Sequence, residues 1–169
     1  SAGPIMAQQA IRTSADGLQA GEVEVPAKDG QKIPGYFAAP AKAGRFPVIL
    51  VIPEVWGMHE YQKDICRRLA KAGCFAVTSD PFFRKGDLSK VADIKEVLAA
   101  ANTLTDEQAF ADLDSVVDWS GKHAKANIAK LGITGMCRGG RTVWQYTGHN
   151  PKIKAGVAWY GGLNPMPPA

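Results

Sequence analysis

The ten residues Leu131–Gly140 (LGITGMCRGG) constrain the fold of this 169-residue chain more than any other stretch. They predict a short apolar strand, a tight turn with Cys137 at its apex, and a helix over residues 141–148. Gly135 and Gly139 flank the turn with the Gly-x-nucleophile-x-Gly spacing of a nucleophile elbow. Such a turn strains the backbone of its central residue, so the neighbouring residues must be small. Cys137 is therefore a candidate nucleophile. The amide of Arg138, at the helix N-terminus, is a candidate oxyanion donor that also favours a thiolate.

Two other interpretations compete for these residues. A single cysteine after a strand is more often a small buried hydrophobe than a nucleophile. The segment 135–142 is also one substitution away from the phosphate loop G-x-x-x-x-G-K-[ST], with Asp80 after an upstream strand as a potential magnesium ligand. Arg141 stands where that loop requires lysine, and the two residues are not interchangeable at a phosphate.

Composition excludes several classes of protein. Apolar residues make up 46% of the chain and the net charge is only +4, which is typical of one globular domain. No apolar run reaches the roughly 18 residues of a membrane span, and the scattered basic residues do not favour nucleic-acid binding. The three cysteines form no C-x-x-C pair and no cluster with histidine, so we expect no zinc site. Cys66 and Cys74 are expected to pack in the core.

The first 21 residues are expected to form an N-terminal extension, loosely ordered over 8–21, ahead of a single domain over 22–169. There is no initiator Met, and residues 5–7 (IMA) could pass for the end of a signal peptide. The charged and apolar regions that normally precede such a site are absent. A cloning remnant is the alternative, so the compartment stays open between cytoplasm and periplasm.

Strand and helix patterns alternate along the rest of the chain. Asp29-Gly30 between Glu22–Ala27 and Lys32–Ala39 predicts a β-hairpin. Further strands are expected over 47–53, 74–79, 128–134 and 153–159, and helices over 59–72, 89–101 and 105–120. This order predicts an α/β fold: a mostly parallel sheet with helices on both faces, led by an antiparallel hairpin. The loops 54–59, 80–85 and 137–139 follow carboxyl ends of strands, where such sheets carry their sites.

Three motifs in this order resemble the dienelactone hydrolase (carboxymethylenebutenolidase) family, a branch of the α/β-hydrolases with a cysteine nucleophile. They are Pro53–Glu60 (PEVWGMHE), Ser79–Arg84 (SDPFFR) and Gly135–Gly140 (GMCRGG). The resemblance runs from about residue 22 to residue 163. It implies the α/β-hydrolase fold and hydrolysis of a carboxylate-bearing lactone or ester, without a metal or cofactor.

The resemblance also assigns roles to residues of the motifs. Cys137 matches the family's nucleophile, and Glu54 matches a glutamate that contacts the resting thiol and helps to make the thiolate when substrate arrives. A carboxylate beside a thiol keeps it protonated by like-charge repulsion. Val55 would supply the second oxyanion amide, beside that of Arg138. Arg84 matches the arginine that binds the substrate's carboxylate, a planar group that a guanidinium can hold through two hydrogen bonds.

Each assignment has an alternative. Trp56, Phe82 and Phe83 are candidates for the apolar wall of the cleft, and core packing explains them equally well. Glu54 could instead be a helix-entry carboxylate, and Arg84 a surface arginine. The phosphate-loop interpretation explains neither of these two residues. A dinucleotide site is weaker still, because no acidic residue ends the strand at 153–159.

An α/β-hydrolase triad follows the order nucleophile, acid, histidine, but no Asp or Glu follows Cys137 in this sequence. His149, the only later histidine, should lie about 18 Å along the helix. His123 is expected at the opposite end of the sheet. His59 is on the correct side, but is expected to start a helix, in a His59–Glu60 pair that the family also shows.

The acid and the histidine are therefore expected beyond residue 169, on a C-terminal segment of the same protein that docks as a partner. In the family they follow the next two strands, which this chain does not contain. The apolar strand at 153–159 would then be an unpaired edge, and the chain alone is expected to be inactive. The alternatives are a non-catalytic remnant or binding protein on a hydrolase scaffold, and a hydrolase of another small ester.

Overall fold

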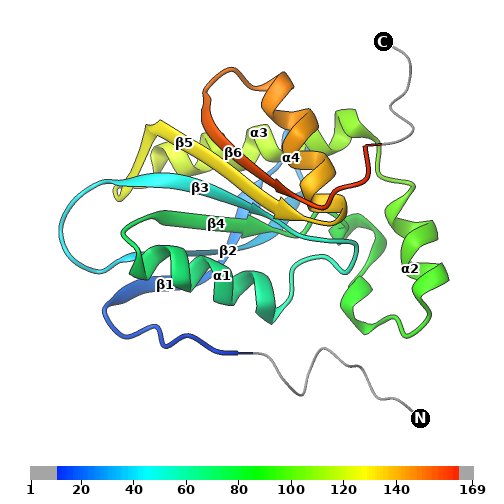
Figure 1. Cartoon of the computed structure of the whole chain (residues 1–169), viewed down its shortest axis with the longest axis horizontal. Coiled ribbons are helices and arrows are strands. Elements are labelled where there is room, and N and C mark those ends of the chain that lie inside the picture. The colour runs from blue at the N-terminus through cyan, green and yellow to red at the C-terminus, as the bar shows by residue number, and fades with distance from the viewer. Residues whose placement is uncertain (1–10, 164–169) are drawn as a thin grey trace.

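The structure is a computed structural model that describes residues 11–163, and its centre is a six-stranded sheet (Figure 1). The strands are β1 (Leu18–Pro26), β2 (Lys32–Pro40), β3 (Phe46–Ile52), β4 (Phe75–Ser79), β5 (Ala126–Met136) and β6 (Ile153–Trp159). The helices are α1 (Glu60–Lys71), α2 (Ile94–Ala101), α3 (Asp106–Lys122) and α4 (Arg138–His149), with the short 3-10 helices η1 (Phe83–Lys85) and η2 (Leu88–Lys90).

The strands lie in the order β1-β2-β4-β3-β5-β6. The β1–β2 hairpin is antiparallel, and β2 also runs antiparallel to β4. The other neighbours, from β4 through β3 and β5 to β6, are parallel. The prediction of a mostly parallel sheet led by an antiparallel hairpin is confirmed. This order places the carboxyl ends of β3, β4, β5 and β6 at one edge of the sheet.

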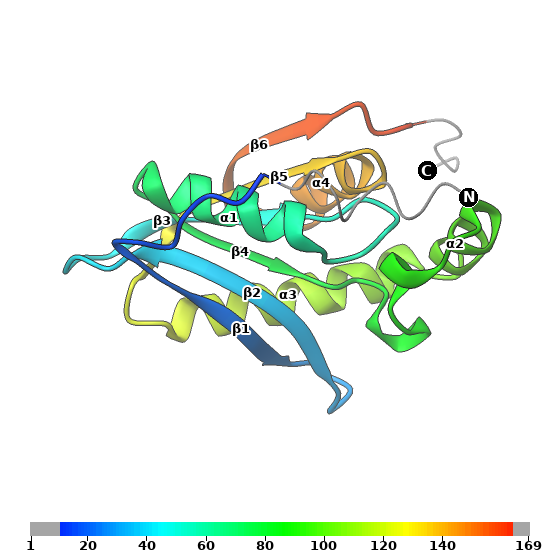
Figure 2. The same ribbon diagram turned by 90° about the horizontal axis from the view of Figure 1, so that it is seen from below.

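Helices cover both faces of the sheet, with α1 on one face and α3 and α4 on the other (Figure 2). Cys66 and Ala70 of α1 pack with Val51 of β3 in one buried cluster. Val116 of α3 and Val143 of α4 belong to a second cluster on the opposite face. Burial on both faces explains the nearly continuous apolar sequences of β3 and β4.

Several element boundaries differ from the predictions. β1 begins at Leu18, inside the segment expected to be loose, because a turn at Gly17 brings the chain into register with Pro40. The helix predicted over 89–101 begins only at Ile94, where the Asp93 side chain caps it. The elbow helix starts at Arg138, three residues early, because the first turn of α4 forms directly on the strained Cys137.

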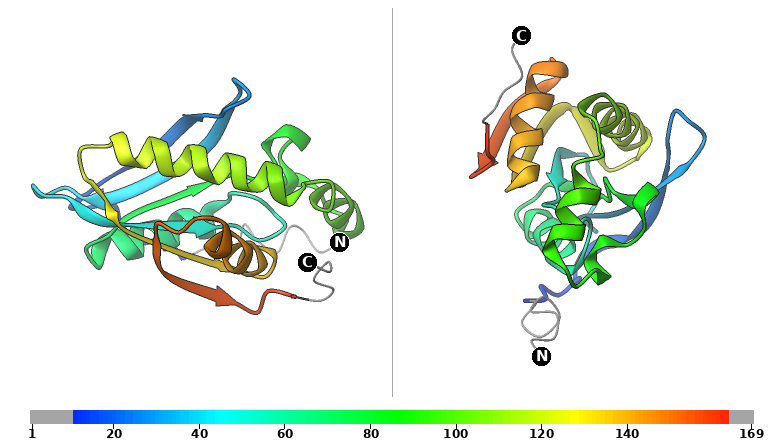
Figure 3. Two further views of the ribbon diagram at one scale, coloured as in Figure 1. Left: turned by 90° about the horizontal axis from the view of Figure 1, so that it is seen from above. Right: turned by 90° about the vertical axis from the view of Figure 1, so that its right-hand side faces the viewer.

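The outer strand β6 is exposed and has no neighbour beyond it within residues 11–163, as the sequence predicted for this apolar strand. It lies with α4 on the side away from the β1–β2 hairpin (Figure 3). Val157, Trp159 and Trp144 are each about half exposed. Between β6 and α4 lies a groove of about 670 Å³. Among the described helices, none has the length and apolarity needed to cross a bilayer.

His123 at the end of α3 gives a first prediction. Its ring lies 4.9 Å from the rings of both Phe37 and Phe75, and its Nδ1 accepts from the Lys125 amide. Burial, aided by the charge of Lys125, lowers the pKa of His123. The folded state therefore favours the neutral ring, and stability should fall as the pH drops below about 6.5, the ordinary value. The free energy of unfolding, measured with urea across this pH range, should depend less on pH in His123→Gln than in the unmodified chain. An unchanged pH dependence would contradict the prediction.

Candidate active site

Cys137 lies in the strained turn that the sequence predicts. Its backbone has φ 55° and ψ −125°, and it is one of only two non-glycine residues with positive φ among residues 11–163. The turn joins the end of β5 to the start of α4, and the Cys137 amide donates to the carbonyl of Trp159, 3.0 Å away on β6. A bulky L-residue avoids this conformation unless the surroundings impose it.

The glycines around Cys137 are required by close packing. A methyl group on Gly139 would lie 2.4 Å from the carbonyl oxygen of Ile52 and 2.6 Å from that of Pro53. A methyl group on Gly135 would lie 2.8 Å from the carbonyl oxygen of Gly139. The elbow is thus packed directly against the end of β3, where the loop that carries Glu54 begins.

The carboxylate of Glu54 is held by the N-terminus of α1. Its Oε2 accepts a hydrogen bond from Nε2 of Gln62 and lies 3.7 Å from Nε2 of His59. Only 17% of the Glu54 side chain is exposed. His59 caps α1, as the sequence predicted. The role of Gln62 was missed, although the spacing His59-x-x-Gln62 resembles the capping-box pattern and could have indicated it.

Tyr160 is a second residue that the sequence interpretation missed. It follows β6 and has φ 38° and 75% exposure. The pKa of Tyr160 is raised, first by partial burial and then by the charges of Cys137 and Glu54. Its backbone directly follows Trp159, whose carbonyl accepts from the Cys137 amide. Its position at the carboxyl end of a parallel strand, the same edge of the sheet as Cys137, could have indicated that it belongs to the site.

Buried contacts hold the loop that follows β3 in place. Val55 is buried in an apolar cluster with Phe82, and Trp56 packs against it. Asp80 accepts a hydrogen bond from the amide of Phe82, and a methyl group on Gly57 would lie 2.8 Å from its Oδ1, so Asp80 packs against both loops; burial raises its pKa. Only 2% of Phe82 is exposed, so core packing accounts for it better than the predicted cleft wall.

Arg84 does not have a free guanidinium. It donates to Asp112 at 2.6 and 3.0 Å and to Asp29 at 2.7 and 3.2 Å. Its guanidinium also stacks on Phe83, 4.2 Å from the ring centre, and Phe83 packs against the core. Among the described contacts, none joins Arg84 to the Cys137 turn.

The side chain of Arg138 is partly buried, and this burial lowers its pKa. It donates to the carbonyl of Leu104 at 3.2 Å and lines a cavity of about 30 Å³ with Phe82 and Asp112. The side chain is thereby held by the protein itself. This leaves the backbone amide, at the first position of α4, as the group of Arg138 available for an oxyanion.

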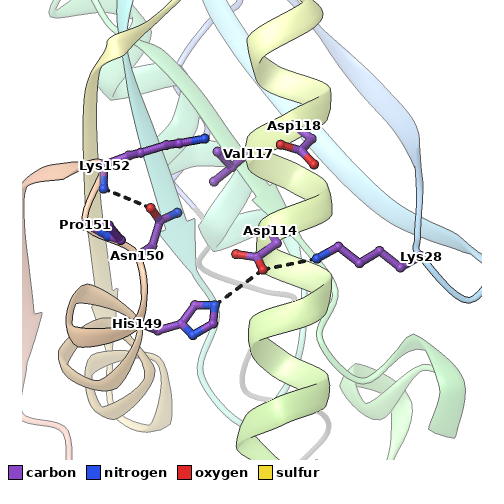
Figure 4. Close-up of a pocket in the computed structure, with 8 residues that line it drawn as sticks. All are labelled: Lys28, Asp114, Val117, Asp118, His149, Asn150, Pro151 and Lys152. Atoms are coloured by element: carbon purple, nitrogen blue, oxygen red, sulfur yellow. Dashed lines mark hydrogen bonds and ion pairs between the residues drawn. The ribbon is translucent and has the colours of Figure 1, made fainter.

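His149 has an acid partner, but at the wrong end of α4. Its Nε2 lies 3.4 Å from Oδ2 of Asp114, which also pairs with Lys28 (Figure 4). His149 lies twelve residues beyond Cys137 along α4, about 18 Å at 1.5 Å per residue. This pair therefore cannot serve the Cys137 thiol. In residues 11–163 no three His, Cys, Asp or Glu side chains gather as metal ligands would.

The sheet order, with a cysteine on a strained turn between a parallel strand and a helix, defines the α/β-hydrolase class. The solved structure "Putative Dienelactone Hydrolase" from Klebsiella pneumoniae is similar, with a TM-score of 0.81 and 41% identity over 85% of this chain and 60% of that one. Residues 33–169 match the family model of the dienelactone hydrolase family. This chain belongs to the dienelactone hydrolase family, as its motifs suggested.

Curated relatives agree with this assignment. The chain is 49% identical, over 95% of its length, to the "Putative carboxymethylenebutenolidase" of Methylorubrum extorquens, and spans 55% of that protein. It is 41% identical, over 94% of its length, to the protein of that name in Escherichia coli K12, and spans 58% of it. The chain thus spans little more than half the length of these relatives.

Proposed function

We propose that this chain carries the nucleophile of an enzyme that hydrolyses a small lactone or ester through Cys137. The observation that carries the proposal is the backbone of Cys137, held at φ 55° between glycines that admit no methyl group. Strain of this kind persists only where the surroundings impose it, and it is typical of functional sites. Membership of the dienelactone hydrolase family supports ester or lactone hydrolysis as the reaction class.

In the proposed reaction the Cys137 thiolate attacks the carbonyl carbon, and the amides of Val55 and Arg138 donate to the resulting oxyanion. Collapse of the tetrahedral intermediate breaks the bond to the ring or ester oxygen and leaves a thioester. Water then attacks this thioester, which releases the acid and restores the thiol. Glu54 keeps the resting thiol protonated and takes its proton when substrate arrives.

The substrate is proposed to bear a carboxylate. Arg84 remains the proposed binder from the family resemblance, but its pairing with Asp29 and Asp112 means that a substrate must compete with two carboxylates. Trp56 and the exposed Tyr160 are the better-placed candidates for the wall of the cleft, since Phe82 and Phe83 pack inward.

We further propose that the acid and histidine of the triad belong to a C-terminal polypeptide segment that packs on β6. The exposed edge of β6, with Trp144 and Trp159 half exposed beside the α4 groove, supports a covering segment. The chain lacks Asp and Glu after Cys137, and its own Asp114–His149 pair is remote. Without that segment we expect little hydrolysis.

The second candidate is a non-catalytic binding protein on the same scaffold. It is favoured by one observation: the Asp114–His149 pair, whose histidine follows the elbow, lies too far along α4 to reach the Cys137 thiol. Labelling with iodoacetamide and a hydrolysis assay together separate the two candidates. If the chain belongs to an enzyme, iodoacetamide should label Cys137 at least about tenfold faster than Cys66 or Cys74. Burial raises the pKa of those two thiols, and the thiolate is the form that reacts with iodoacetamide.

Peptide mapping by mass spectrometry would identify the labelled thiol. Aryl-ester and lactone hydrolysis, measured with the C-terminal segment present, should then be lost in Cys137→Ala and retained in Cys74→Ala. No hydrolysis by the unmodified protein with the segment present would reject the enzyme and leave the binding protein, and hydrolysis that survives Cys137→Ala would show that Cys137 is not the nucleophile.

A further inference from the structure

Building on the proposed role of Cys137 and Glu54, we propose that His59 is a positioning residue for Glu54. In this role His59 donates its Nε2–H to the Glu54 carboxylate and so moderates the negative charge beside the thiol. The starting observation is that Nε2 of His59 is buried and has no hydrogen-bond partner, although it lies only 3.7 Å from Oε2 of Glu54. A buried donor without a partner is costly, so its position calls for an explanation.

The hydrogen bonds of α1 decide which ring nitrogen carries the proton. Nδ1 of His59 accepts from the backbone amide of Tyr61 at 3.4 Å, as the cap of the helix. In a neutral imidazole one nitrogen accepts and the other donates, so Nε2 is the donor. This donor faces a carboxylate oxygen, and a shift of well under 1 Å would bring the pair to the usual N–H···O distance of about 2.9 Å.

Gln62 holds both partners in place. Its Oε1 accepts from the His59 backbone amide at 3.2 Å, which turns its NH₂ group toward Oε2 of Glu54. Gln62 is only 2% exposed, and 12% of the His59 side chain is exposed. One oxygen of Glu54 thus faces two donors from a single helical turn. The cap of α1 is arranged to receive this carboxylate.

The same turn lies next to the elbow. The Tyr61 hydroxyl donates to Sδ of Met136, the residue before Cys137, at 3.6 Å. A donor aimed at Glu54 reduces the negative potential that the carboxylate creates, so a second negative charge, the thiolate, costs less. Removing that donor should therefore make the Cys137 thiolate harder to form. The effect should require the Glu54 charge.

A double-mutant cycle tests this dependence. His59→Asn keeps a good helix cap but is too short to reach Glu54. We expect it to slow iodoacetamide labelling of Cys137 at neutral pH by about threefold or more. In the Glu54→Gln background the same substitution should leave the rate nearly unchanged. Equal slowing in both backgrounds would indicate a purely structural role for His59 and would overturn the proposal, as would no slowing in either.

The inference remains testable if Cys137 is labelled too slowly for rates to be compared, or if the hydrolysis test rejects the proposed function. ¹⁵N NMR of the three histidine rings can identify the Nε2 proton of His59 by its loss in His59→Asn. Its resonance should shift in Glu54→Gln and stay in place in Glu60→Gln, since Glu60 pairs with Arg67 instead. A resonance whose chemical shift is unchanged in Glu54→Gln would overturn the inference. The melting temperature of His59→Asn should stay close to that of the unmodified chain.

Discussion

Gly139→Ala is expected to lower the free energy of unfolding by about 4 kcal/mol or more, at the upper end of single substitutions. The added methyl group would lie 2.4 Å and 2.6 Å from the carbonyl oxygens of Ile52 and Pro53. Both neighbours are backbone atoms at the buried end of β3, where Ile52 pairs with Gly135 of β5 and Pro53 follows directly, so moving them would disturb the sheet. Urea unfolding followed by circular dichroism measures the loss.

Gly148→Ala in the same helix is the matched control. A methyl group at Gly148 meets nothing within 4 Å, and the residue lies inside α4. Alanine is a better helix former than glycine by about 1 kcal/mol, so this variant should be slightly more stable. The two substitutions add the same group to one helix and should act in opposite directions. A loss of less than about 1 kcal/mol in Gly139→Ala would show that the elbow can relax, against the argument from close packing.

The elbow could be predicted because its constraints are local. A strand that must turn within three residues into a helix requires small residues close to Cys137, and Gly135 and Gly139 lie two residues before and after it in the sequence. The alternation of apolar runs with helical patterns likewise depends on nearby residues. The same holds for the Asp29-Gly30 hairpin.

Contacts between distant segments could not be predicted in this way. Arg84 pairs with Asp29 and Asp112, which are 55 and 28 residues away, and no local pattern links these positions. The late start of α2 has a local cause that the prediction missed, since the Asp93 side chain caps a shorter helix. The approach of His59 to Glu54 depends on the path of the loop between them, which composition does not specify.

Asp64 carries the second large prediction. It is only 1% exposed, and its carboxylate pairs with Arg68 at 2.7 Å and lies 3.6 Å from Arg67, while the amide of Thr13 donates to it. Asp64→Ala would leave the buried Arg67 with Glu60 as its remaining ionic partner and release the segment before β1. Removing one member of a buried ion pair costs about 3–5 kcal/mol, which is the loss of unfolding free energy we expect.

Glu24→Ala is the control and should change stability little, because Glu24 and Lys32 form an ion pair at 2.7 Å with both side chains largely exposed to water. The pH dependence adds a second test. Burial acts to raise the pKa of Asp64, but hydrogen bonds from Thr13 and Arg68 outweigh it and the pKa is lowered. The stabilisation is therefore present above the ordinary value of about 3.9 and disappears as the pH falls through the lowered one. In Asp64→Asn the free energy of unfolding should therefore fall less steeply as the pH is lowered through this range. An equally steep fall would show that other carboxylates cause the loss of stability in acid.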